Sequence, residues 1–135
     1  MAKVVFKRLN DGDDLVETLE KLAEREGIGA ALVTVVGMVR NPSLGYYSGP
    51  ERGYVVNKLE GVYELASCTG NVSLLNGKPF VHLHAVVASP NGEAKAGHVL
   101  KGTRVANTCE VMLVVGEVPV ERRKDEKTGL YLLEA

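Results

Sequence analysis

The chain has 135 residues, the length of one ordinary domain, and no linker or internal repeat divides it, so we expect a single domain over residues 1–135. Its composition, 45% hydrophobic and 24% charged, excludes the disordered and fibrous classes of protein. The formal net charge of −1 provides no basic excess for displacing counterions from DNA, so only a local basic patch could bind nucleic acid.

The predicted elements begin with a strand and a helix. Residues 3–9 (KVVFKRL) have a strand pattern, and residues 11–29 predict a helix because leucines recur at helical spacing. The apolar face of this helix comprises Leu15, Val16, Leu19, Leu22 and Ala23. We expect Asp11 or Asp13 to cap its start and Gly27 to end it.

The rest of the chain is expected to be β. Residues 29–39 are too β-branched for a second helix and predict a buried strand. Further strands are predicted at 53–58, 62–75, 80–88, 103–116, and in a closing hairpin between 118–123 and 129–135. Asn76-Gly77 is a strong hairpin signal, and Pro90-Asn91-Gly92 predicts another turn. One helix and about seven strands after it predict an α+β domain of two layers with a mostly antiparallel sheet.

The three histidines lie within seventeen residues, at His82, His84 and His98. Positions i and i+2 of a strand share a face, with Cα atoms roughly 6.5 Å apart, so His82 and His84 can converge on one ion. The turn at residues 90–92 returns the chain, which lets His98 reach the same face. Three imidazoles with one position left for water or a small anion are typical of an open Zn²⁺ site. The alternative is that two histidines flank a half-buried strand and His98 caps a loop.

Other charged residues are weaker candidates. Glu110 interrupts an apolar run and shares a strand face with Arg104; it could be a fourth ligand, orient an imidazole or act as a general acid or base. An ion pair with Arg104 or with a lysine across the sheet is the alternative, and Glu64 admits the same two interpretations. Arg40-Asn41-Pro42 ends a predicted strand, where Arg40 could present a cation to an anionic ligand; a plain turn is the alternative. The mixed-sign run at 121–127 predicts a solvated hairpin tip.

Two further patterns concern the cellular compartment. No stretch approaches the ~20 apolar residues of a membrane span, and the N-terminus turns acidic within a dozen residues, unlike a signal peptide. Cys68 and Cys109 each lie in an apolar run, so we expect two buried, reduced thiols rather than a disulfide. Together these patterns favour the cytoplasm.

Four segments, in this order, resemble the plants-and-prokaryotes-conserved (PPC) domain family: DGDDLVETLEKLAEREGI, VVGMVRNPSLGYY, YELASCTGNVSLLNGKPFVHLHAVVA and AGHVLKGTRVANTCEVML. The resemblance runs from about Asp11 to Leu113 and implies a two-layer domain that assembles as a homotrimer. In plants the domain follows AT-hooks and serves in transcription-factor assembly, whereas prokaryotic members stand alone and often carry a DNA-binding label. This chain lacks the Arg-Gly-Arg-Pro core of an AT-hook, so that label has little local support.

A more distant resemblance concerns the histidines. HLH followed by GHVL is similar to the zinc-ligand segments of acetolactate decarboxylase and of a related zinc-dependent ester hydrolase. The resemblance implies that His82, His84 and His98 are zinc ligands. Glu110 and Arg104 match the glutamate and arginine of the decarboxylase site by residue type alone.

Three hypotheses for the function follow, in order of support. The first is a metal-binding homotrimer, with zinc as the expected ion, a possible small anionic ligand at the metal and no assigned activity. The second is a DNA-associated or transcription-regulatory module. The third is a zinc-dependent enzyme acting on a small 2-oxo acid or ester. The trimer also has a physical reason, because the runs at 35–39 and 111–115 carry more apolar surface than one helix can cover.

Overall fold

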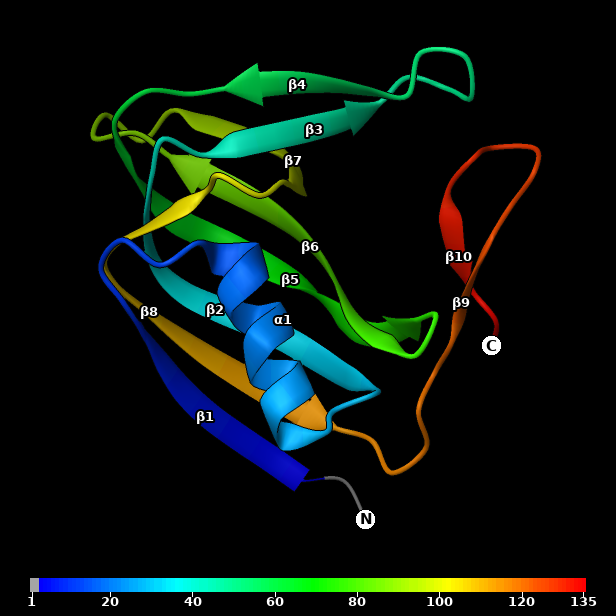
Figure 1. Ribbon diagram of the computed structural model, residues 1–135. Coiled ribbons are helices and arrows are strands. Elements are labelled where there is room, and N and C mark those ends of the chain that lie inside the picture. The colour runs from blue at the N-terminus through cyan, green and yellow to red at the C-terminus, as the bar shows by residue number, and fades with distance from the viewer. Residues whose placement is uncertain (1–2) are drawn as a thin grey trace.

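Helix α1 (Leu15–Glu26) lies across one face of an eight-stranded antiparallel sheet in the computed structural model, which describes residues 3–135 (Figure 1). The strands are β1 (Lys3–Asn10), β2 (Ala31–Arg40), β3 (Ser43–Tyr47), β4 (Tyr54–Lys58), β5 (Val62–Leu75), β6 (Lys78–Ala88), β7 (Ala94–Val99), β8 (Arg104–Val115), β9 (Arg122–Lys124) and β10 (Tyr131–Leu133). Their order in the main sheet is β1-β8-β2-β5-β6-β7-β3-β4, and β9 pairs with β10 in a separate hairpin. The predicted α+β class is therefore confirmed.

The ends of α1 follow from its capping residues. Asp14 is the N-cap: one carboxylate oxygen accepts from the Glu17 amide at 2.9 Å and the other from the Gly102 amide at 2.6 Å. The prediction of Asp11 or Asp13 as the cap was wrong. The Asp13 carboxylate accepts from the Asn10 amide, and the Asp11 carboxylate accepts from the Asn107 amide on β8. Gly27 ends the helix in the left-handed conformation, as predicted.

The hydrophobic core lies between α1 and the sheet. Every residue predicted on the apolar face of the helix is buried there. Alternate residues of the strands face it, including Val33, Val72, Leu83 and Val111. Cys68 and Cys109 are also buried in this layer as free thiols, as expected. The opposite face of the sheet is open, apart from the stretch near the β9–β10 hairpin.

Strands β3 and β7 were not predicted from the sequence. Each is short and contains a glycine, Gly45 or Gly97, which weakens a strand pattern. In the structure these glycines mark close approach between the two strands instead: a Cβ on Gly97 would lie 2.9 Å from the Gly45 carbonyl oxygen. Six of the predicted strands belong to the main sheet and the last two form the separate β9–β10 hairpin, so β3 and β7 bring the main sheet to eight strands where about seven were expected.

The described part of the chain contains one helix, and it is neither long nor apolar enough to cross a bilayer. The turn at Asn76-Gly77 has positive φ at both residues, 52° and 77°, which matches the predicted hairpin. It connects β5 to β6, and this pair of strands forms the floor of the candidate site.

Candidate metal centre

The three histidines lie together on the open face of the sheet. Strand alternation puts His82 and His84 on the same side of β6, opposite Leu83, which is buried beneath the helix. β7 pairs with β6 so that His98 lies directly across from His84. The two predicted steps, alternation along one strand and return of the chain through residues 90–92, are both present.

The separations between the imidazoles suit one shared ion. The Nε2 atoms of His82 and His84 are 3.2 Å apart, and one ring nitrogen from each histidine lies within 4.8 Å of those of the other two. Nitrogens that are each 2.0–2.1 Å from a tetrahedral Zn²⁺ lie roughly 3.3–3.4 Å from one another. The first pair already has this spacing, and a movement of about 1.5 Å or less closes the triangle.

Burial keeps two of these imidazoles neutral. It lowers the pKa of His82 to about 4, with smaller contributions from the charges of His98, His84 and Arg122. Burial likewise lowers the pKa of His98, helped by His84 and Arg122. Neutral imidazole is the form that ligates a metal. At neutral pH these two rings therefore present lone pairs rather than positive charges.

One nitrogen of the cluster lacks a partner. His98 Nδ1 is buried and makes no hydrogen bond. A buried imidazole nitrogen without a partner is uncommon, and a cation held among the rings would reorganise their hydrogen bonding. Together with the all-nitrogen donor set, this fits a borderline metal such as Zn²⁺ better than Mg²⁺ or Ca²⁺, which prefer oxygen.

A glycine in β5 lets the histidine strand come close. Gly70 pairs with Leu83, and a Cβ placed on it would lie 1.8 Å from the His82 carbonyl oxygen. Only glycine therefore fits this register. The sequence carried a signal here, because a glycine inside a strand pattern often marks close backbone approach, and it went unused.

A cavity of about 660 Å³ opens beside the histidines. Tyr54 stands at its edge, its ring 5.0 Å from that of His98. Thr69, directly across from His84 on β5, contributes a hydroxyl to the wall. Among residues 3–135, no carboxylate lines this cavity. It has room for a small molecule but offers no acid or base other than the histidines and tyrosines.

The other charged candidates lie elsewhere. Glu110 and Arg104 are on β8, which is separated from β6 by β2 and β5, so roughly 14 Å of sheet divides them from the histidines. Glu110 is exposed and lies across from Arg8, and Glu64 is exposed near the far end of β5. The structure does not bring these residues to the histidines.

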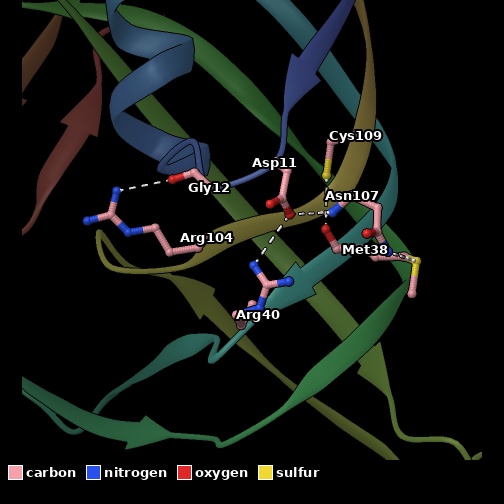
Figure 2. Close-up of polar contacts among 7 residues, drawn as sticks. All are labelled: Asp11, Gly12, Met38, Arg40, Arg104, Asn107 and Cys109. Atoms are coloured by element: carbon pink, nitrogen blue, oxygen red, sulfur yellow. Dashed lines mark hydrogen bonds and ion pairs between the residues drawn. The ribbon is translucent and has the colours of Figure 1, made fainter.

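Figure 2 shows what the arginines contact instead. Arg40 pairs with Asp11 at 3.4 Å, and Arg104 donates to the Gly12 carbonyl, also at 3.4 Å. Asp11 accepts in addition from the amide of Asn107, whose φ is +64°, and this hydrogen bond is the main cause of the lowered pKa of the Asp11 carboxyl. These contacts hold the turn between β1 and α1 against a bulge of β8.

The sequence analysis missed Arg122. The expected solvated hairpin tip over 121–127 is wrong at this position, because Arg122 is only 8% exposed. Its side chain turns inward onto Asn71 and Ser73, two polar residues on the open face of β5. Asn71 and Ser73, two hydrogen-bonding side chains at alternate positions of β5, were the available signal.

An antiparallel sheet under one helix, with three convergent histidines on its open face, defines a small α+β domain with a candidate metal centre. The chain belongs to the Plants and Prokaryotes Conserved (PCC) domain family, abbreviated PPC above, whose model matches residues 1–117. The resemblance seen in the sequence is thereby confirmed.

Solved structures agree with this assignment. A PPC protein of Pyrococcus horikoshii is 30% identical, with a TM-score of 0.90 over 100% of this chain and 95% of that one. A metal-containing protein of Archaeoglobus fulgidus is 36% identical, with a TM-score of 0.88 over 98% and 94%. A protein of Ralstonia eutropha with a provisional DNA-binding designation is 25% identical, with a TM-score of 0.88 over 96% and 90%.

Two matches reach beyond these proteins. The acetolactate decarboxylase of Bacillus subtilis is 15% identical, with a TM-score of 0.58 over 83% of this chain and 52% of that one, which shows a shared fold alone. Among curated proteins, a bifunctional protein GlmU of Synechococcus sp. is 28% identical over 129 residues, 94% of this chain. The chain spans only 19% of that relative's length.

Proposed function

We propose that this domain binds one divalent metal ion, Zn²⁺ in preference to others, through His82, His84 and His98. The observation that carries the proposal is the convergence of three ring nitrogens within 4.8 Å on one face of the sheet. Burial lowers the pKa of both His82 and His98, which supports the proposal because protons compete less for those nitrogens at neutral pH. The metal-containing relative of 36% identity points the same way.

Such an ion would supply Lewis acidity at the edge of the cavity. Three protein ligands leave at least one coordination position for water or a small anion. The two free, buried cysteines suit a reducing compartment, and we assign the protein to the cytoplasm on that ground.

Element analysis of the purified protein tests the metal site directly. We expect close to one zinc per chain, and a loss of that zinc in His82→Ala with the fold retained. Thr69→Ala is the matched control, because Thr69 lines the same cavity but offers no strong zinc ligand. Equal metal content in His82→Ala and Thr69→Ala would exclude the histidine site.

We also propose that the chain assembles as a homotrimer through the open face of β1, β8 and β2. Large apolar side chains lie exposed there, and strand register places Val4, Val114 and Leu32 in one row. Phe6, two residues after Val4 on the same face of β1, is 73% exposed. A contiguous exposed apolar patch of this kind favours burial against another copy of the chain. Sedimentation as a monomer at micromolar concentration would contradict the assembly.

A DNA-associated regulatory role is the second candidate. It is favoured by the provisional designation of the Ralstonia relative, and disfavoured by the net charge of −1. Phosphate contacts make DNA affinity fall steeply with salt concentration. A titration of duplex DNA at increasing salt therefore decides this candidate: the absence of a steep dependence would exclude it.

A zinc-dependent enzyme acting on a small 2-oxo acid or ester is the third candidate. The cavity of about 660 Å³ beside the histidines favours it, because a substrate could reach the ion. Glu110 and Arg104 do not line that cavity. Turnover of such substrates by the zinc-loaded chain, abolished in His82→Ala, is the result that this candidate requires.

A further inference from the structure

Three hydrogen bonds hold the side chain of Arg122, the first residue of β9, between the C-terminal hairpin and β5. Its Nε donates to the Ser73 hydroxyl at 2.6 Å, and one terminal nitrogen donates to the Asn71 side-chain oxygen at 2.7 Å. The other terminal nitrogen donates to the Tyr131 carbonyl at 2.8 Å. The guanidinium also stacks over the ring of Phe80, 4.8 Å from its centroid. The side chain is thus fixed in position.

The positive charge of Arg122 has no acidic partner. No carboxylate of residues 3–135 forms an ion pair with it, although Arg123, the next residue, pairs with Glu134 at 3.0 Å. A buried charge without a counter-charge is costly, and each of its present partners is neutral. This arrangement is typical of a site that receives its negative charge from a ligand.

The guanidinium also keeps donors for such a ligand. Arginine has five N–H groups, and three are used, which leaves one on each terminal nitrogen. Guanidinium N–H groups donate readily to carboxylate oxygens. Asn71, which Arg122 contacts, lies directly across from His82 in the β5–β6 register, and Phe80 precedes His82 on the same face. Arg122 and the histidine cluster therefore lie beside one another, and both line one cavity.

A second cavity, of about 240 Å³, connects these groups. Its wall includes Arg122, His82 and His98, and otherwise consists of aromatic and aliphatic residues with one glycine. Among the described residues, Arg122 is the only charged side chain that lines it. One fixed positive charge among apolar walls matches a ligand with one negative charge and an apolar body.

We propose that Arg122 binds the carboxylate of a small monocarboxylic acid whose apolar part fills this cavity and whose far end reaches the histidines. The proposal deepens the metal site proposed above, on which it rests for the role of the histidines, by naming the class of ligand. Docking of the carboxylate on Arg122 requires only the hairpin and β5, and it is measurable with or without metal.

Calorimetry with benzoate, and with benzyl alcohol as a neutral analogue, tests the proposal on the metal-stripped and the zinc-loaded full chain. A charge-assisted contact corresponds to about a ten- to hundredfold gain in affinity. We expect benzoate to exceed benzyl alcohol by that factor in the wild type and in Arg123→Gln, and the preference to disappear in Arg122→Gln. Equal binding of the two probes, or equal loss in both variants, would overturn the assignment.

Two further readouts separate the possible failures. If Arg122→Gln does not fold, nitrogen NMR of the wild type replaces it: benzoate must shift the Nε–H signal of Arg122 and leave that of Arg123 in place, and the reverse result overturns the proposal. Zinc content is measured on the same samples. Absence of zinc with selective benzoate binding would refute the metal site alone, whereas zinc uptake without benzoate preference would refute the carboxylate site alone.

Discussion

Substitution of Gly70 by alanine tests how closely the histidine strand depends on its neighbour. The new Cβ would lie 1.8 Å from the His82 carbonyl oxygen, 2.8 Å from the His82 carbonyl carbon and 2.9 Å from the Leu83 Cα. All three atoms are backbone atoms, so no side-chain rotation relieves the contact. Separation to about 3.2 Å, a tight but tolerated contact, requires β6 to move by more than 1 Å.

A displacement of that size affects both stability and metal binding. Overpacking of a well-packed site costs about 1–3 kcal/mol of the free energy of unfolding. Metal–nitrogen distances tolerate only about 0.2 Å of error. A backbone shift of more than 1 Å adds to the adjustment that the imidazole side chains already need to reach one ion, so we expect it to weaken the ligand set. We expect Gly70→Ala to lower zinc affinity at least tenfold in a competition titration with a chelator, and to lower the midpoint of thermal unfolding.

Gly116→Ala is the matched control. A Cβ at Gly116 would lie 3.6 Å from the Ala30 Cβ, which is an ordinary contact, and Gly116 lines neither cavity beside the histidines. This variant should be neutral or gain up to about 1 kcal/mol, because alanine restricts the unfolded chain. Unchanged zinc affinity and stability in Gly70→Ala would refute the reasoning, since the strands would then have room that the structure denies.

Three further predictions concern pH, assembly and the helix cap. Between pH 7 and pH 5 the free energy of unfolding in urea should fall by about 1 kcal/mol more for the metal-free wild type than for His82→Ala. The reason is that the His82 imidazole has a pKa near 6.5 in the unfolded chain and about 4 in the folded chain, so acid favours the unfolded state. Equal losses in the two proteins would contradict this. Phe6→Asp should convert the assembly to monomer in sedimentation, whereas Val118→Asp, an exposed apolar residue off that face, should not. Asp14→Ala should cost about 1–2 kcal/mol in thermal unfolding through loss of the cap and of the Gly102 contact, and Asp14→Asn should cost less.

The sequence predicted those elements whose periodicity is strong. Helix α1, the β5–β6 hairpin and the long β8 all have clear apolar periods or turn residues, and their bounds fell within a few residues of those observed. The cap at Asp14 was misassigned because three aspartates lie within four positions and tertiary contacts, not local pattern, decide which of them caps the helix. Strand order is equally a property of tertiary packing.

The candidate site divides in the same way. His82 and His84 were placed on one face by strand alternation, which is a local property, and His98 joined them through a recognisable turn. The position of Arg122 could not be predicted from local pattern. Its burial depends on contacts of the hairpin with Asn71 and Ser73, about fifty residues earlier in the chain. Glu110 and Arg104 were candidates by residue type alone. Residue type does not determine where a strand lies in the sheet, and β8 is separated from β6 by β2 and β5.

The β9–β10 hairpin lies outside residues 1–117, the part that the family model matches, yet it supplies Arg122 and the Tyr131 carbonyl beside the histidines. It is held by a few long-range contacts, among them the Leu74 amide to the Val120 carbonyl and the Tyr47 hydroxyl to the Thr128 carbonyl. The nitrogens of the cluster and the cation next to it are thus encoded in separate stretches of the gene. A substitution in the terminal stretch can therefore change the side chains beside the histidines without altering the strands that carry them.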